Sequence, residues 1–171
     1  VTDTDGCCDA VLFTHYHGDH TGQTLRIRPE ISLYAGALAK EIMLISARHG
    51  GPKNDALCQR MEGIQTFSPG KPLLIGDIQI TPFCIDHSAA DSYLFLIEAD
   101  GKRVLYTGDF RLHGVRGGTM DKILDRRIDK VDVVITEGTT VSRPSGSVVT
   151  EWDLQKRVKA YLKQYKYVFV L

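Results

Sequence analysis

The sequence predicts an α/β fold built mainly as one domain. Short apolar runs of strand length alternate along it with segments of helical periodicity, a pattern typical of layered α/β proteins. The chain has 171 residues, of which 43% are hydrophobic and 25% are charged, and this is enough for one packed core. All apolar runs are far shorter than the ~20 residues of a membrane span, so we expect no membrane partner.

The segments expected to form strands are mostly apolar and are bounded by turn residues. They are 10–14, 31–35, 65–67, 78–85, 93–98, 103–107, 131–136 and 167–171. Asp100-Gly101 lies between two of these runs and is a strong hairpin signal. The apolar content of 131–136 predicts that this strand is buried.

Helices are predicted by apolar residues that recur every three or four positions. The predicted helices are 21–26, 37–48, 120–127 and 151–165. In the second of them Leu38, Ile42 and Ile45 follow a helical spacing, which predicts that they face the core. Thr150 and Asp153 fit the cap that begins the last helix.

Three histidines and an aspartate occur within six residues directly after the first predicted strand. They are His15, His17, Asp19 and His20. Neutral imidazole is the commonest metal ligand in proteins, so this cluster predicts a metal site. Side chains at i and i+2 of an extended segment point the same way, so His15 and His17 are expected to bind one ion together.

Gly18 divides the cluster into two parts. We expect the chain to turn there, because glycine adopts conformations that other residues avoid. Asp19 and His20 would then face a neighbouring position, suited to a second ion.

Three further strand ends carry residues able to complete such a site. His87 follows the run 78–85, Asp109 follows the hairpin, and Glu137 follows the run 131–136. A carboxylate such as that of Asp109 can bridge two cations through its two oxygens. An acidic residue in the position of Glu137 is costly unless it is solvated, hydrogen-bonded or near a cation. Of the remaining histidines, His49 is expected to be a helix-end residue and His113 to lie near the cleft.

These residues resemble the HxHxDH signature of the metallo-β-lactamase superfamily, with His87 and Asp109 matching its later metal-binding histidine and bridging aspartate. The resemblance implies a partial αββα sandwich of the metallo-β-lactamase type and a hydrolase with two zinc ions. His15, His17 and His87 would hold one ion, Asp19 and His20 the other, and Asp109 would bridge them. A metal-bound hydroxide would be the nucleophile, oriented by Asp19.

A finer resemblance concerns the β-CASP branch of RNA- and DNA-processing nucleases. Gly108-Asp109-Phe110-Arg111 and Thr136-Glu137-Gly138-Thr139 resemble its motifs, which implies that Glu137 is catalytic and that RNA or DNA is the substrate. The chain would then comprise a metallo-β-lactamase-like domain over 1–150 and a segment, 151–171, leading towards an inserted β-CASP domain. On this interpretation the first strands of the fold and the last histidine of the second metal site lie outside the sequence.

Two other functions remain open at this stage. One is a small-molecule hydrolase of the same fold, such as a thioesterase, lactonase or β-lactamase, which the zero net charge mildly favours. The other is a scaffold protein with a relict metal site. The cysteines have no CxxC spacing and the adjacent Cys7 and Cys8 do not suit a structural disulfide, so reduced thiols and a cytoplasmic location are expected. The oligomeric state is open.

Overall fold

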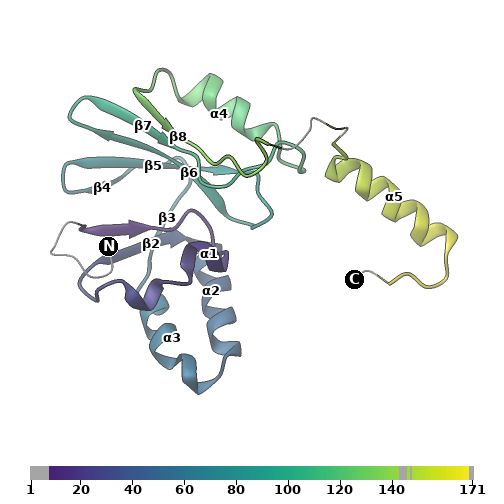
Figure 1. Ribbon diagram of the computed structural model, residues 1–171, viewed down its shortest axis with the longest axis horizontal. Helices are drawn as coiled ribbons and strands as arrows, with labels where there is room; N and C mark the ends of the chain where they lie inside the picture. The colour runs from purple at the N-terminus through teal and green to yellow at the C-terminus, as the bar shows by residue number, and fades with distance from the viewer. Residues whose placement is uncertain (1–7, 143–145, 147, 170–171) are drawn as a thin grey trace.

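The computed structural model describes residues 8–142, 146 and 148–169. Two β-sheets pack face to face, with helices on their outer faces (Figure 1). Helices α2 and α3 cover one sheet and helix α4 covers the other. The order of the layers is therefore helix, sheet, sheet, helix, and the predicted α/β sandwich is confirmed.

The first sheet is short and entirely parallel. It has three strands, in the order β1 (Ala10–Leu12), β2 (Ser32–Gly36) and β3 (Gln65–Phe67). Parallel strands need a crossover connection between them, and α2 (Ala37–His49) and α3 (Asp55–Glu62) supply it between β2 and β3. Buried apolar side chains of the sheet and of these helices form one core cluster, which includes Leu33, Met43, Met61 and Ile64.

The second sheet is larger and mostly antiparallel. Its order is β4 (Leu73–Ile75), β5 (Ile78–Ile85), β6 (Ser92–Ala99), β7 (Lys102–Tyr106) and β8 (Val133–Ile135), with only the last pair parallel. The predicted hairpin joins β6 to β7, and both Asp100 and Gly101 have positive φ angles, as a tight hairpin turn requires. Helix α4 (Thr119–Arg127) packs Met120 and Ile123 against this sheet.

A third apolar cluster joins the inner faces of the two sheets. Phe67 of β3 contacts Tyr93 and Phe95 of β6, with ring centroids 4.9 and 5.6 Å apart in edge-to-face geometry. At the same interface the Tyr93 amide donates to the Thr14 carbonyl at 3.0 Å. The bond holds the segment after β1 beside the beginning of β6, and the first cluster of predicted metal ligands starts at the next residue, His15.

Two sequence predictions about packing are wrong. Helix α2 buries Ala39, Met43 and Ala47, whereas Leu38 and Ile45 are exposed, because the small alanines let the helix approach the sheet closely. Strand β8 is exposed at all three residues, because it lies at the edge of its sheet within the described residues.

Other segments differ in their limits. In place of one helix over 21–26, a short helix α1 (Gly18–Thr21) precedes a 3₁₀ turn over Thr24–Arg26. Helix α3 and strand β4 were not predicted. Residues 167–169 form no strand, and the last two residues of that prediction lie outside the described part of the chain.

The last helix, α5 (Glu151–Gln164), begins where it was predicted. Thr150 and Asp153 form a reciprocal capping box, in which each side chain bonds the other's backbone amide. The helix lies to the side of the two sheets (Figure 1), and none of its residues is buried. The division of the chain at residue 150 stays a prediction.

Candidate metal centre

The centre begins where β1 ends. After Leu12 the chain passes through Phe13 and Thr14 to His15, whose side chain is fully buried. Thr14 Oγ1 lies 3.0 Å from His15 Nδ1 and fixes the ring, so that Nε2 faces inward. His15 Nε2 lies 3.1 Å from His17 Nδ1. The two side chains point to one place, as their i, i+2 spacing predicted.

His87 and Asp109 reach the same place from the second sheet. His87 follows β5 by two residues, and its Nε2 lies 3.3 Å from His17 Nδ1. Asp109 follows β7 across Gly108, whose positive φ of 57° turns the chain. A side chain at Gly108 would press on Thr14 and on the Tyr93 carbonyl, so glycine also permits the close approach of the two sheets there.

Asp109 lies between the histidines. Its Oδ2 is 3.3 Å from His20 Nε2, 3.9 Å from His87 Nε2 and 4.0 Å from His15 Nε2. Two groups result whose possible ligand atoms all lie within 4.8 Å of one another: His15, His17 and His87, and His15, His20 and Asp109. A donor set of imidazole nitrogens and one carboxylate suits zinc, and the central carboxylate suits a bridging role.

Asp19 is the exception among the predicted ligands. Its side chain is 78% exposed, and its Oδ2 lies 3.6 Å from His20 Nε2. It belongs to neither of the two groups. Asp19 therefore lies at the rim of the centre, on the solvent side of His20.

The surroundings keep the central histidines neutral, which is the form that binds metal. Burial, together with the neighbouring His20, His87 and His17, lowers the pKa of His15 to about 4. Burial also lowers the pKa of His87, although the Asp109 carboxylate opposes this. Both rings offer lone pairs at neutral pH, so these residues fit a metal centre.

Gly18 does not form the predicted turn. It begins helix α1, has no positive φ, and a Cβ added to it would meet no atom within 4 Å. The change of direction after His17 comes instead from the start of the helix, with His17 as its N-cap residue. Asp19 and His20 are carried on the first turn of α1.

Glu137 lies next to the centre and bonds to the backbone around it. Its Oε1 accepts the amide of Phe110 at 2.9 Å, and its Oε2 accepts the amide of Thr139 at 3.4 Å. Burial by itself would raise the pKa of Glu137, but these hydrogen bonds outweigh it and hold the pKa below its usual value. The ionised carboxylate fixes the residue that follows Asp109.

The two other histidines lie apart from both ligand groups. His49 is exposed at the end of α2, with Nδ1 2.9 Å from the Ile45 carbonyl, as its helix-end position predicted. His113 is exposed and lines a shallow cleft with Phe110 and Glu137. Sequence reasoning missed the residues behind the ligands, chiefly the buried Asp86 and its partner Arg111.

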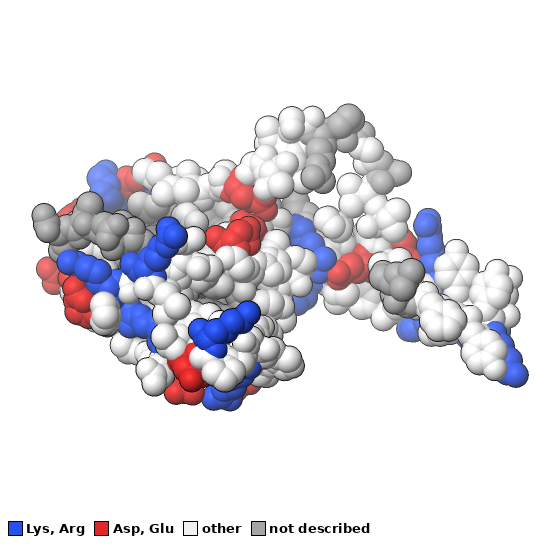
Figure 2. Space-filling view, turned by 60° about the horizontal axis from the view of Figure 1, so that its bottom comes forward, with Lys and Arg blue, Asp and Glu red and all other residues white. Residues whose placement is uncertain are grey.

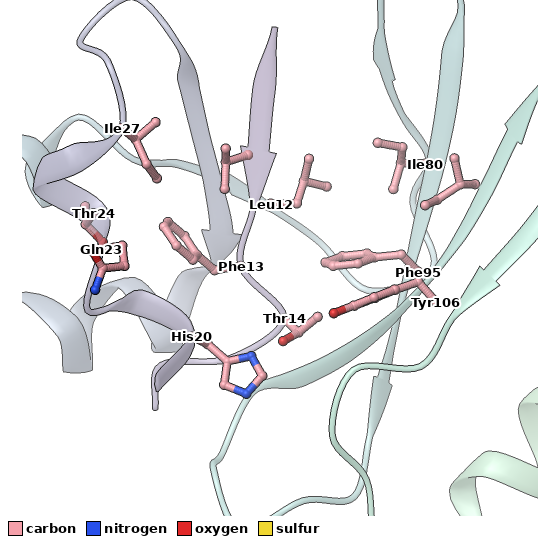
Figure 3. A pocket seen from close by; sticks show the side chains of 12 residues that line it. Leu12, Phe13, Thr14, His20, Gln23, Thr24, Ile27, Ile80, Phe95 and Tyr106 are labelled. Atoms are coloured by element: carbon pink, nitrogen blue, oxygen red, sulfur yellow. The ribbon is translucent and has the colours of Figure 1, made fainter. Parts of the chain in front are cut away.

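An apolar cavity of about 450 Å³ adjoins the centre between the two sheets. Figure 3 shows His20 and Thr14 at one end of it, with Phe13, Phe95 and Ile80 among the side chains that line its length. The proposed ligands other than His20 do not line it. The cavity thus adjoins the centre at His20, and its lining is mostly apolar.

The formal charges of the chain balance, and both signs occur on the face seen in Figure 2. Acidic and basic side chains are interspersed over that face. Within the described part of the chain, no helix has the length and apolar character needed to cross a membrane.

A family model described as a β-lactamase superfamily domain matches residues 4–163. The chain belongs to the β-lactamase superfamily. This superfamily consists of metal-dependent hydrolases, and the cluster of histidines with Asp109 agrees with a metal-binding member of it.

Solved structures show the same superfamily fold. A protein of unknown function from Enterococcus faecalis V583 superposes with a TM-score of 0.76 over 95% of this chain and 41% of its own, at 24% identity. Zn²⁺-bound PqqB from Methylobacterium extorquens superposes with a TM-score of 0.52 over 84% of this chain and 52% of its own, at 20% identity. The metallo-β-lactamase-like fold expected from the motifs is confirmed.

One curated relative is an RNase J-like protein from Methanocaldococcus jannaschii. It is 28% identical over 143 residues, which cover 79% of this chain and 32% of the relative. The chain thus spans about a third of the length of the curated relative that it matches.

Proposed function

We propose that the chain carries the metal centre of a β-CASP-type nuclease that hydrolyses phosphodiester bonds of RNA, or of DNA. The observation that carries this proposal is the bond from the Phe110 amide to Glu137 Oε1, which joins the two motifs that resemble the β-CASP branch directly beside Asp109. The similarity to an RNase J-like protein supports the same substrate class.

The residues suggest a division of work around two zinc ions. His15, His17 and His87 would hold one ion, His20 and Asp19 the other, and Asp109 would contact both. When bound, such ions supply Lewis-acid chemistry and a water of lowered pKa. That the PqqB structure is Zn²⁺-bound supports zinc as the metal.

The structure favours different roles for the two acidic residues Asp19 and Glu137. Asp19 is exposed at the rim with its Oδ2 on the side of His20, so its carboxylate would hold the second ion and orient a water there. Both oxygens of Glu137 already accept backbone amides, which favours a role in fixing Phe110 and hence Asp109. We therefore propose Glu137 as a positioning residue, in place of the catalytic role that the resemblance implied.

The cavity supports a second candidate, a small-molecule hydrolase of the same fold. An apolar space that ends at His20 suits the hydrocarbon part of a thioester or lactone. For both candidates the free thiols of Cys8, Cys58 and Cys84 favour a reducing, cytoplasmic setting. Cys7 lies outside the described residues.

The test incubates the purified protein with end-labelled single-stranded RNA in the presence of zinc or manganese. His17→Ala removes a ligand from the first group and is expected to abolish cleavage. His49→Ala removes an exposed histidine outside both groups and is the matched control, expected to cleave like the wild type. Absence of cleavage by the wild type, or equal cleavage by both variants, would contradict the proposal.

The same preparations distinguish the alternative. A thioester, a lactone and a β-lactam are offered in place of RNA. Turnover of one of them that is lost in His17→Ala, without RNA cleavage by the wild type, would assign the chain to the small-molecule class.

A further inference from the structure

Beside the metal centre lies an ion pair between a buried carboxylate and a partly buried guanidinium. Its two members are close in sequence to two proposed ligands. Asp86 directly precedes His87, and Arg111 follows Asp109 by two residues. Arg111 Nε donates to Asp86 Oδ1 at 3.1 Å, and the Arg111 amide donates to the Asp86 carbonyl at 2.9 Å. The two ligand segments are thus joined by both side chain and backbone.

The second oxygen of Asp86 is engaged as well. It accepts the amide of Arg116 at 3.0 Å, and Gly114 packs so closely on the carboxylate that a side chain there would overlap it. Only 6% of Asp86 is exposed. A buried carboxylate is tolerated where its oxygens are paired in this way, and losing one partner leaves an uncompensated charge.

We propose that Asp86 and Arg111 are positioning residues that hold His87 and Asp109 at the separation required for metal binding. His87 and Asp109 come from different strands of the second sheet, β5 and β7, with β6 between them. Their ligand atoms lie 3.9 Å apart, and the bonds of this pair are the contacts that close the loop after Asp109 onto the residue before His87.

The pair also connects the centre to helix α5. Arg111 Nη2 lies 2.7 Å from Glu151 Oε1, and the other oxygen of Glu151 accepts the amide of Val115 at 2.8 Å. The Glu151 amide in turn donates to the His113 carbonyl at 3.0 Å. The planar guanidinium of Arg111 makes both contacts at once, which a lysine ammonium cannot reproduce in the same geometry.

The inference rests on the metal centre of the proposed function but not on its substrate, so the test measures metal binding. Co²⁺ is titrated into the metal-free protein, and affinity and the visible absorption spectrum are recorded. Asp86→Asn and Arg111→Met are expected to weaken Co²⁺ binding by roughly 10–100-fold, the usual effect of removing residues that orient ligands, and to change the spectrum. Arg111→Lys, which keeps the charge, is expected to fall between Arg111→Met and the wild type.

Asp132→Asn is the matched control. Asp132 also accepts one cationic side chain, Lys102 Nζ, and one backbone amide, that of Arg103, but it does so at the start of β7, the end opposite Asp109. The Asp132→Asn variant is expected to bind Co²⁺ with the affinity and the spectrum of the wild type. Should Asp86→Asn fail to fold by circular dichroism, Gly114→Ala displaces the same carboxylate without changing its charge, and Arg111→Lys alters its partner.

The outcomes separate this inference from the nuclease proposal. Wild-type affinity and spectrum in the folded Asp86 and Arg111 variants would overturn the positioning pair alone. A wild-type protein that binds no Co²⁺ would overturn the metal centre and the pair together. Weakened Co²⁺ binding in the variants, with no RNA cleaved by the wild type, would support the positioning role of the pair and contradict the nuclease proposal.

Discussion

The buried imidazole of His15 shows how strongly one residue can depend on its surroundings. It belongs to both possible ligand groups, is fully buried, and is held by Thr14 on its outer nitrogen. Without a metal ion it must stay neutral, because burial and three neighbouring histidines all oppose its protonation.

This makes the metal-free protein sensitive to acid. The pKa of His15 is about 4 in the folded state and 6.5 when unperturbed, so the unfolded chain binds the proton first as pH falls. The contribution to stability is fully present above pH 6.5 and is lost on the way down to about pH 4, by up to about 3 kcal/mol. Urea unfolding with EDTA at pH 7.5 and pH 4.5 measures the difference.

His15→Gln is the control for that measurement, because it removes this titration and leaves the carboxylates unchanged. The loss of stability between the two pH values is expected to be smaller in the variant. Equal losses in the variant and the wild type would show that His15 does not contribute.

Two glycines near the centre are expected to respond in opposite ways to alanine. Gly18→Ala meets no neighbouring atom and lies in a helix, so the free energy of unfolding should stay constant or rise by up to about 1 kcal/mol. Gly108→Ala places a methyl group 3.0 Å from Thr14 Cγ2 at a positive φ and should cost about 1–3 kcal/mol. Urea unfolding measures the free energy of unfolding of both variants. A larger loss for Gly18→Ala than for Gly108→Ala would contradict the assignment of the strained turn to Gly108.

At the scale of elements, helix α2 is capped by a residue far along the chain. Its own N-cap, Gly36, has no side chain, and the Ala39 amide bonds to Asp91 Oδ2 at 2.9 Å. Asp91 also accepts the Tyr93 hydroxyl at 2.5 Å and has a positive φ of 61°. The cap therefore connects α2, which covers the first sheet, to the beginning of β6 in the second sheet.

Asp91→Ala is expected to destabilise the protein more than Asp100→Ala. Both aspartates have positive φ, so both variants carry the cost of alanine in that conformation, but only Asp91 loses a helix cap and the partner of a buried tyrosine. The difference in free energy of unfolding should be about 1–2 kcal/mol, measured by denaturant titration. A difference near zero would mean that the cap contributes nothing.

The elements that sequence predicted well are those with local signals. The turn Asp100-Gly101 and the capping box at Thr150 are determined by residues a few positions apart. The proposed ligands were also recognisable, because each follows a strand, and the sheets bring strand ends together.

What sequence did not predict depends on contacts between distant segments. Helix α2 has apolar residues on more than one side, and the small Ala39 and Ala47 face the sheet although Leu38 is more hydrophobic. Asp86 looks in sequence like any acidic residue at a strand end. Its importance comes from Arg111, which is 25 positions away in the chain.

At the scale of the molecule, strand β8 combines the edge of a sheet, within the described residues, with exposed apolar side chains. Val133, Val134 and Ile135 of β8 are each about half exposed, and β8 has β7 as its only partner among the described residues. An exposed apolar edge strand is a template for pairing with another chain.

The 171-residue chain is therefore expected to self-associate as its concentration rises, and Val134→Lys should reduce this, because lysine on an edge strand opposes pairing. Val115→Lys is the matched control, since Val115 has the same 53% exposure but lies in a loop. Sedimentation velocity over a concentration series provides the measurement. Equal effects of the two variants would attribute association to apolar area and not to the strand edge.

Arg111 contacts two carboxylates that differ in exposure, Asp86 and Glu151, and ionic strength should therefore affect the two contacts differently. The Asp86 side chain is 5% exposed, whereas Glu151 on the other side of the guanidinium is 33% exposed. Dissolved ions screen exposed charges far more than buried ones. Added salt should therefore weaken the contact of Arg111 with Glu151 before its contact with Asp86, so that the hold of Arg111 on α5 varies with salt while metal binding stays constant.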